Sequence, residues 1–419
     1  MGLRRVCELD GVEAVEVAKR LRWLGGLVFF DTVGNVPQGA GRAISVVAAA
    51  PRAVHRGAVD AEADVEFLRA RINGGEAAGG DLGFPAGGLC GWVDYEGKFV
   101  FGEYAEMLIR DEGSGEWWEC GGLSGRLADA ADGRVTIGEF HEEMGQKKFL
   151  SAVGRVKEWI AAGDIYQVNV TQGFRADVVG EGTLFGLYEI LREVSPAPMA
   201  AWLELDGKEI LSSSPELFLK VSGRAIETRP IKGTRPRFPD VDEDRRAAVE
   251  LQTSPKEMAE LVMITDLLRN DLGQVCEYGS VEVSAMLQLE SLAQVHHLVS
   301  TVRGTLREGM DAIGALAECF PGGSITGAPK KRAMEIIAEL EGGARGVYCG
   351  AIGWLGFNGE SQFSIAIRTL VRDGSELRYQ VGAGIVADSS PEEEYQETLQ
   401  KAVGIRLGLE RYRQRGEPC

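Results

Sequence analysis

Two turn signals between apolar runs constrain the fold of this chain more than any other feature of its sequence. Asn358 and Gly359 separate one pair of apolar runs, and Asp373 and Gly374 separate the next pair. Asn-Gly and Asp-Gly favour tight hairpin turns, in which the central residues adopt a positive φ. Residues 346–386 are therefore predicted to form a meander of three antiparallel strands.

Helical segments accompany these and other strand-like runs. Apolar residues recur at helical spacing in Glu142–Ala162 and in Ser254–Asp271. A long helix is predicted from Pro391 to about Arg413. Antiparallel strand pairs with helices on their outer side predict an α+β fold, an antiparallel β-sandwich with helices packed outside, rather than a doubly wound parallel sheet.

The first 140 residues or so differ in composition from the rest. They are rich in Gly and Ala, and short apolar runs such as Leu123–Leu127 predict antiparallel strands. Helices are predicted at Val12–Leu24 and Asp64–Ile72. Because a Lys- and Glu-rich segment begins at Glu142, we expect two domains, residues 1–140 and residues 141–419.

Charge and cysteine content argue against several classes of function. A net charge of −18 does not suit a nucleic-acid surface, where Lys and Arg would cluster. The seven cysteines form no CxxC pair, so neither a zinc site nor a disulfide framework is expected. No apolar run is long enough to span a membrane, and no apolar signal core is seen. We expect a cytoplasmic protein with no nucleic-acid or membrane partner.

Lys232 is the strongest candidate for a nucleophile. It lies between Pro230 and Gly233, which predict a stiff turn. A lysine attacks only as the neutral amine, which burial or cationic neighbours favour. Three arginines are close in sequence: Arg229, Arg235 and Arg237. Taken alone, the segment favours the alternative, a solvated lysine in a basic loop.

Two pairs of carboxylates stand in the first turns of two predicted helices. Glu257 and Glu260 form one pair, and Glu394 and Glu397 form the other. Residues three apart share a helix face, so the pairs would converge if the helices meet. Such a cluster would need a hard cation, for which Mg²⁺ is the usual choice. The alternative is that each pair only complements the helix dipole.

Several segments have the features of anion-binding sites. The glycine-rich loop 320–330 leads into a helix, so the amides of Gly327 and Ala328, helped by Lys330, would face a carboxylate. An ordinary helix-capping turn is the alternative. Arg368 stands in a mostly apolar strand, either at its end facing water or binding a carboxylate. The small residues of 381–385 would let a ligand approach the backbone.

The motifs occur in a fixed order across about residues 145–410: Ser213–Leu217, Pro230–Thr234, Glu257–Leu272, Val295–Gly304, Gly327–Lys330, the strand ending at Arg368, and Gly382–Lys401. Together they resemble the chorismate-utilising enzymes, which include the component I subunits of anthranilate synthase and aminodeoxychorismate synthase and the isochorismate and salicylate synthases. The N-terminal third matches more loosely.

The resemblance implies the chorismate-binding fold and a role for each motif. Lys232 would be a covalent nucleophile and Glu216 the general acid. Glu260 and Glu397 would ligate Mg²⁺, with Glu257 and Glu394 helping directly or through waters. The implied chorismate-binding residues are His297, Ser324, Gly327, Tyr348, Arg368, Gly382, Gly384 and Lys401.

Two positions separate the subfamilies. Anthranilate synthases usually carry alanine where Lys232 stands, so this lysine resembles aminodeoxychorismate synthase component I, which serves 4-aminobenzoate and folate synthesis. Isochorismate and salicylate synthases place a water-activating lysine where this chain has Gln167. We therefore expect ammonia as the incoming nucleophile.

The resemblance also implies a partner. None of the cysteines stands in a Gly-x-Cys-x-Gly turn of the kind that a cysteine amidotransferase needs, so ammonia would come from solution or from a separate glutaminase subunit. Anthranilate synthase component I remains the nearest alternative. A non-catalytic subunit on the same fold is a further one, although it would be expected to have lost part of the site.

Overall fold

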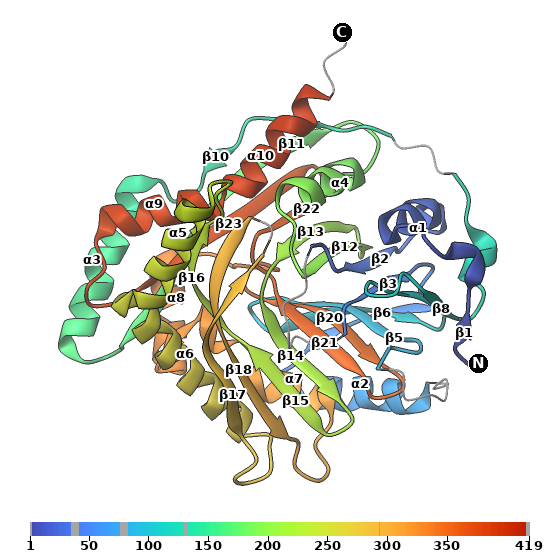
Figure 1. Ribbon diagram of the computed structural model, residues 1–419, viewed down its shortest axis with the longest axis horizontal. Coiled ribbons are helices and arrows are strands. Elements are labelled where there is room, and N and C mark those ends of the chain that lie inside the picture. Colours follow the sequence, from blue (N-terminus) through green and yellow to red (C-terminus); the bar gives the residue numbers. More distant parts are fainter. Residues whose placement is uncertain (1, 35–41, 76–82, 130–132, 293, 416–419) are drawn as a thin grey trace.

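The computed structural model describes residues 2–34, 42–75, 83–129, 133–292 and 294–415. Its strands form two antiparallel sheets with helices around them (Figure 1). The α+β sandwich predicted from the sequence is thus confirmed.

The first sheet has thirteen strands. In spatial order, its main path consists of β1 (Arg4–Arg5), β8 (Trp117–Cys120), β7 (Met107–Asp111), β3 (Ile44–Ala48), β2 (Val28–Asp31), β12 (Met199–Leu205), β13 (Lys208–Ser214), β22 (Thr369–Asp373), β23 (Glu376–Ile385), β11 (Gln167–Val179) and β10 (His141–Glu142). Two short strands pair with β11 off this path: β9 (Thr136–Ile137) and β19 (Gly327–Ala328).

The second sheet has ten strands. Its path is β16 (Ile231–Pro236), β18 (Val295–Thr305), β15 (Ala225–Arg229), β14 (Leu217–Ser222), β21 (Ser361–Ile365), β20 (Ala351–Gly356), β5 (Gly88–Val93), β6 (Lys98–Tyr104) and β4 (Ala53–Ala58), with β17 (Glu282–Ser291) pairing with β18.

A shared apolar core joins the inner faces of the two sheets. Val28 and Phe30 of β2 pack in one cluster with Trp92 of β5 and Trp354 of β20. Phe29, between them in sequence, packs with the outer helices instead. Because successive strand side chains point to opposite faces, a strand buried on both sides has a continuous apolar sequence.

The helices cover the outer faces. The first sheet is covered by α1 (Ala14–Leu21), α4 (Phe185–Val194) and α10 (Val403–Gln414). A second outer cluster includes α2 (Glu62–Gly74), α3 (Gln146–Ala162), α7 (Ala312–Cys319) and α8 (Lys330–Glu341). The remaining helices are α5 (Val241–Thr253) and α6 (Pro255–Gly273) beside β16 to β18, and α9 (Pro391–Lys401) on β23. Figure 1 shows α3, α5, α6, α8 and α9 grouped at one end of the molecule.

The predicted three-stranded meander is wrong in one respect. The segment forms four strands, and the hairpin β20–β21 belongs to the second sheet whereas β22–β23 belongs to the first. The chain crosses between Ile365 and Thr369, and Arg368 adopts a left-handed φ of 51° there. Both predicted turns are present, but turn residues fix the hairpins and not the sheet that each hairpin joins.

Two other predictions need correction. Leu123–Arg126 forms a 3-10 turn rather than a strand, because Glu119 accepts hydrogen bonds from the backbone and hydroxyl of Ser124 and folds the chain back. The long C-terminal helix is two helices that meet at Ala402. The second packs on α4, with the backbone of Gly404 close against Ser195.

The predicted division at residue 140 stays a prediction. Strands from the two parts pair in both sheets, since β2 pairs with β12 and β5 pairs with β20.

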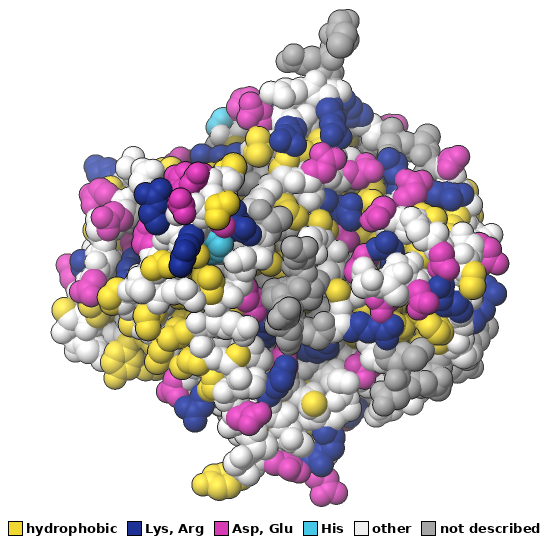
Figure 2. All heavy atoms as spheres, viewed as in Figure 1, with side chains coloured by type: hydrophobic (Ala, Val, Ile, Leu, Met, Phe, Trp, Pro, Cys, Tyr) yellow, Lys and Arg dark blue, Asp and Glu magenta, His cyan; other side chains and the backbone are white. Residues whose placement is uncertain are grey.

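Acidic and basic side chains are mixed over the face shown in Figure 2. Within the described ranges, no helix combines the length and the apolar composition that crossing a bilayer would need.

Candidate active site

Glu216 lies at the bottom of the candidate site, directly before β14. It is only 5% exposed, and burial raises its pKa to about 7. The Ser324 hydroxyl donates towards its carboxyl, and the charges of Lys232, Lys401 and Arg368 act on it from three other elements. A carboxyl group that is partly protonated at neutral pH can act as a general acid.

Lys232 lies on β16, opposite Leu298 of β18, and not on the predicted turn. A Cβ at position 384 would lie 3.4 Å from its Nζ, so glycine there leaves room for the amine. The amine lies in the field of three carboxyl groups: Glu216, Glu260 and Glu397. The structure thus places the candidate nucleophile where its charge acts on the candidate acid.

The three arginines near Lys232 in sequence do not supply the expected cationic surroundings. Each is ion-paired with a carboxylate: Arg229 with Glu290, Arg235 with Glu250, and Arg237 with Asp244. The expectation failed because the strand directs alternate side chains to different partners. The charged groups on which Lys232 acts are instead the carboxyl groups named above.

His297 presents a free acceptor to the pocket. Its Nδ1 lies 3.3 Å from the Gly233 carbonyl oxygen, to which it can donate, and 3.0 Å from the Thr234 hydroxyl. Its Nε2 is buried and has no hydrogen-bond partner among the described residues. Burial and the charge of Arg368 lower its pKa to about 3, so the imidazole is neutral. A substrate hydroxyl could donate to Nε2.

Arg368 is suited to hold a carboxylate. It stands where the chain crosses between the sheets, and its guanidinium has no hydrogen-bonded or ion-paired partner within the described part of the chain. Burial lowers its pKa, whereas the charge of Glu216 raises it. A partly buried guanidinium without a protein partner favours binding of an anionic ligand.

Tyr348 is buried and is connected to Glu216 through its neighbour Cys349. Burial raises its pKa, and its hydroxyl interacts with the Cys349 thiol. The Cys349 thiol in turn lies in the field of Glu216. The structure therefore brings Tyr348 close to the site, behind Cys349.

Glu260 of α6 and Glu397 of α9 come together as predicted. Burial raises the pKa of Glu260; Lys232 opposes this, and the charges of Glu257 and Glu397 reinforce it. Burial also acts to raise the pKa of Glu397, but the Lys401 ion pair at 2.7 Å brings it below its ordinary value. Two carboxylates and two lysines therefore share this side of the pocket.

The other two glutamates have partners of their own. Glu257 lies 3.6 Å from Arg235. Glu394 is buried and accepts from Ser389 at 2.7 Å and Lys256 at 3.3 Å, while its Oε2 has no hydrogen-bond partner among the described residues. Among all the residues that the structure describes, no group of three or more Asp, Glu, His or Cys side chains is arranged to hold a metal ion.

The glycines allow close approach of backbone segments. Gly327 pairs with Val168 of β11, and a Cβ there would lie 2.2 Å from the Gln167 carbonyl oxygen. The Gly382 carbonyl accepts from Lys401 at 2.9 Å. A Cβ at Gly384 would lie 2.2 Å from Gln167 Nε2. These glycines therefore determine the shape of one wall of the pocket.

Lys330 does not point at a bound anion, contrary to the expectation for its loop. Its Nζ donates to Asp271 Oδ2 at 2.8 Å and to the Cys319 carbonyl at 3.2 Å. The sequence reasoning also missed Lys256, which acts on Glu260, Glu394 and Glu397. Its spacing of four residues before Glu260 was a signal that could have revealed it.

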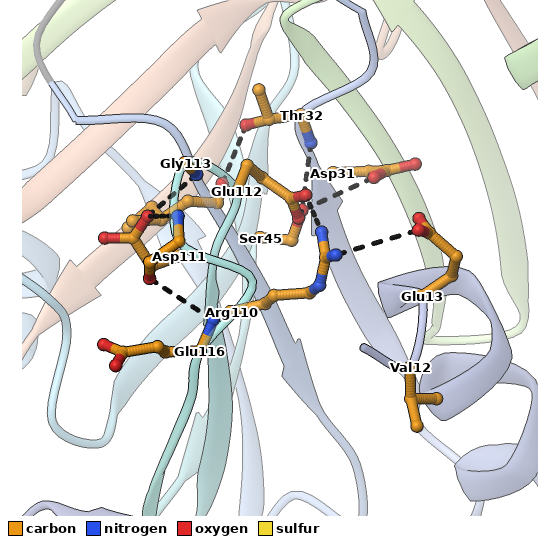
Figure 3. A network of polar contacts seen from close by, with 12 residues as sticks. Val12, Glu13, Asp31, Thr32, Ser45, Arg110, Asp111, Glu112, Gly113 and Glu116 are labelled. Atoms are coloured by element: carbon orange, nitrogen blue, oxygen red, sulfur yellow. Dashed lines mark hydrogen bonds and ion pairs between the residues drawn. The ribbon is translucent and has the colours of Figure 1, made fainter. Parts of the chain in front are cut away.

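A cavity borders His297. It is lined by Thr32, Ile44, Pro198, Met199, Pro215 and Val299, among others. Beside it, Asp31 and Glu112 meet at Ser45, and Glu112 is ion-paired with Arg110 (Figure 3). Arg192 and the Tyr188 hydroxyl also donate to Asp31.

The chain is similar to known proteins along most of its length. The sequence profile of a family described as chorismate binding enzyme matches residues 110–406. Anthranilate synthase component 1 of Methanothermobacter thermautotrophicus is 37% identical over 408 residues, covering 92% of this chain and 87% of that protein. Aminodeoxychorismate synthase component 1 of Bacillus subtilis is 45% identical over 275 residues, covering 66% of this chain and 58% of that protein.

A solved structure is similar along most of the chain. The crystal structure of anthranilate synthase component I from Streptococcus pneumoniae superposes with a TM-score of 0.75 at 28% sequence identity, covering 88% of this chain and 93% of that one. With the family profile matching residues 110–406 and a relative aligned along 92% of the sequence, this chain belongs to the chorismate-binding enzyme family.

Proposed function

We propose that this chain is the component I of an aminodeoxychorismate synthase, which converts chorismate and ammonia to 4-amino-4-deoxychorismate for 4-aminobenzoate and folate synthesis. The observation that carries the proposal is the position of Lys232, whose amine lies in the fields of Glu216 and Glu260. The similarity to the Bacillus subtilis enzyme supports it.

The pocket offers complementary groups to a dicarboxylate with a hydroxyl. Arg368 would bind the enolpyruvyl carboxylate, together with Tyr348 and the backbone near Gly384. Ser324 and the neutral His297 would face the ring, and His297 Nε2 would accept from the ring hydroxyl. These contacts would orient C2 of chorismate towards Lys232.

The carboxylates fit Mg²⁺, which proteins commonly bind with one or two carboxylates plus waters and substrate oxygens. Glu260 and Glu397 would be the ligands: burial, reinforced by the charges of Glu257 and Glu397, raises the pKa of Glu260, and a bound cation would offset both effects. The buried Oε2 of Glu394 could accept from a water in the same place. When bound, Mg²⁺ would act as a Lewis acid and hold the ring carboxylate, helped by Lys401 and the amides around Gly327.

The first half-reaction is an allylic substitution. The neutral Lys232 amine forms a bond to C2, the ring double bond shifts, and the C4–O bond breaks. Glu216 donates its proton to the departing oxygen, which leaves as water. The new secondary ammonium then loses a proton.

The second half-reaction reverses the direction of attack. Ammonia forms a bond to C4, the double bond returns, and the C2–N bond to Lys232 breaks with return of a proton to the lysine nitrogen. The amine at C4 loses its extra proton, and the enolpyruvyl group stays attached. Two successive displacements thus direct amination to C4.

Ammonia would come from a separate glutaminase subunit. The names of the relatives describe them as component 1, which supports a second component for this chain as well. The sequence contains none of the amidotransferase cysteine turns described above.

Anthranilate synthase component I is the second candidate. It is favoured by the Methanothermobacter relative, which aligns along 92% of this chain. That reaction would aminate C2 and eliminate pyruvate, and it has no need of a lysine at position 232.

Product analysis separates the two candidates. The purified chain would be incubated with chorismate, Mg²⁺ and ammonium, with parallel assays for anthranilate fluorescence, for pyruvate, and for 4-aminobenzoate after addition of a lyase. The proposal predicts 4-aminobenzoate only with the lyase and no pyruvate without it. Direct formation of anthranilate and pyruvate would instead identify an anthranilate synthase.

A further inference from the structure

A buried ion pair closes the base of the loop that carries Ser324. The loop joins α7 to α8, and Lys330 at its end donates to Asp271 of α6 and to the carbonyl of Cys319 at its start. The Cys319 thiol approaches the Asp271 carbonyl oxygen at 3.6 Å. Asp271 is 2% exposed. One lysine therefore connects both ends of the loop to one helix.

The same loop rests on α6 at the residue before Ser324. A Cβ at Gly323 would lie 2.6 Å from a methyl carbon of Leu267 and 3.4 Å from Asp271 Oδ2. Ser324 follows directly and donates towards the Glu216 carboxyl. The position of this hydroxyl therefore depends on how the loop is seated on α6.

We propose that the Lys330–Asp271 pair is a positioning device, which seats the loop on α6 so that the Ser324 hydroxyl stays beside the Glu216 carboxyl. The inference rests on the proposed function only in taking Glu216 as the general acid. Neither Lys330 nor Asp271 would touch the substrate, and both would act through Ser324.

The electrostatic consequence has a definite sign. The charged groups acting on the Glu216 carboxyl are Lys232, Lys401 and Arg368, and the Cys349 thiol lies in its field; none of the four belongs to the loop 320–330. Because donation from Ser324 lowers the pKa of Glu216, its loss raises that pKa further. A general acid with a higher pKa stays protonated to higher pH, so the alkaline limb of the rate profile moves upward.

Three variants of the full-length chain separate positioning from folding. Lys330→Met leaves Asp271, whose pKa burial has already raised, free to take up a proton. Lys330→Met with Asp271→Asn removes both charges. Replacing both partners of a buried ion pair commonly costs less stability than removing one of them. Ser324→Ala removes the donor itself and serves as the reference.

The expected result is a drop in kcat of about tenfold for each variant, the size of one hydrogen bond to a charged group. KM for chorismate should change less than about threefold, and the alkaline limb should move to higher pH. Adding Ser324→Ala to the charge-neutral double variant should cause no further loss. Chorismate consumption is the readout, so the effects of the pair variant and of Ser324→Ala can be compared whichever amino product forms.

Independent effects would overturn the inference. If the Lys330→Met, Asp271→Asn change lowered kcat by the same factor in the Ser324→Ala background as in the wild-type background, so that the two losses multiplied, the pair would act by another route. If the charge-neutral variant kept full kcat and an unshifted limb while folded, the pair would have no positioning role. Failure of the proposed function alone would appear differently: the product would change, but Ser324→Ala would still cause no further loss in the variant that lacks both charges.

Discussion

At the scale of single residues, burial sets the protonation states of the pocket. It raises the pKa of Glu216 to about 7 and lowers that of His297 to about 3. Near neutral pH, Glu216 can therefore donate a proton while His297 can accept a hydrogen bond. These are the states that protonation of a leaving hydroxyl and orientation of a hydroxylated ring require.

The Glu216 carboxyl should determine the alkaline side of the pH profile. Activity at saturating ammonia should fall as pH rises through about 7, because the acid loses its proton, and Glu216→Gln should abolish this limb with most of the activity. In the folded protein the pKa lies above its ordinary value of 4.5, so stability is lost as pH rises from there to about 7. Glu216→Gln should therefore increase the free energy of unfolding at pH 8, by up to about 3 kcal/mol. An unchanged profile in the variant would contradict the role.

Lys232 should be indispensable for chemistry and dispensable for binding. Lys232→Ala should lower C4 amination by at least about a thousandfold, since it removes the nucleophile. Chorismate affinity by calorimetry should change less than about tenfold, because Arg368 still holds a carboxylate. Lys148→Ala, at an exposed lysine of α3, is the matched control and should keep full activity. Full C4 amination by Lys232→Ala would refute the covalent mechanism.

Sequence reasoning placed the chemistry-bearing residues better than their surroundings. Lys232, Glu216, Glu260 and Glu397 meet as expected. It did not foresee that Lys330 would pair with Asp271, because motifs name residues and not their partners across the fold.

At the scale of elements, the crossing between β21 and β22 positions Arg368, the residue proposed to bind a carboxylate. The two hairpins join different sheets, so Arg368 lies between them, where a left-handed φ of 51° turns the chain. Turn residues in the sequence predicted both hairpins. Which sheet each hairpin joins depends on long-range pairing with β13 and β14, and local sequence does not encode that pairing.

The ion pair between β2 and α4 should make a large contribution to stability. Arg192 donates to Asp31, whose side chain is 1% exposed. Arg192→Met should lower the free energy of unfolding by about 3 kcal/mol, because it leaves a buried carboxylate without its cationic partner. Chemical denaturation would measure this. Arg175→Met is the control: it breaks the exposed pair with Glu376 and should cost less than about 1 kcal/mol. Equal costs for the two variants would contradict this assignment.

At the scale of the whole molecule, the two sheets unite the N-terminal and C-terminal parts of the chain. β2 pairs with β12, and β5 pairs with β20, so removal of residues 1–140 would expose an edge in each sheet. Unpaired edges promote association between chains. A fragment of residues 141–419 should therefore aggregate or lack a cooperative thermal transition, as measured by size-exclusion chromatography and circular dichroism. A monomeric fragment that unfolds cooperatively would instead support the predicted division into two domains.

The central claim is that Lys232 forms a covalent bond to chorismate. The most direct test is peptide mass mapping of the enzyme after incubation with chorismate and Mg²⁺ in the absence of ammonia, with rapid acid quenching. The account predicts that the peptide containing Lys232 gains the mass of chorismate less one water, and that added ammonium removes this adduct. A turnover-competent enzyme whose Lys232 peptide stays unmodified at every quench time would contradict it.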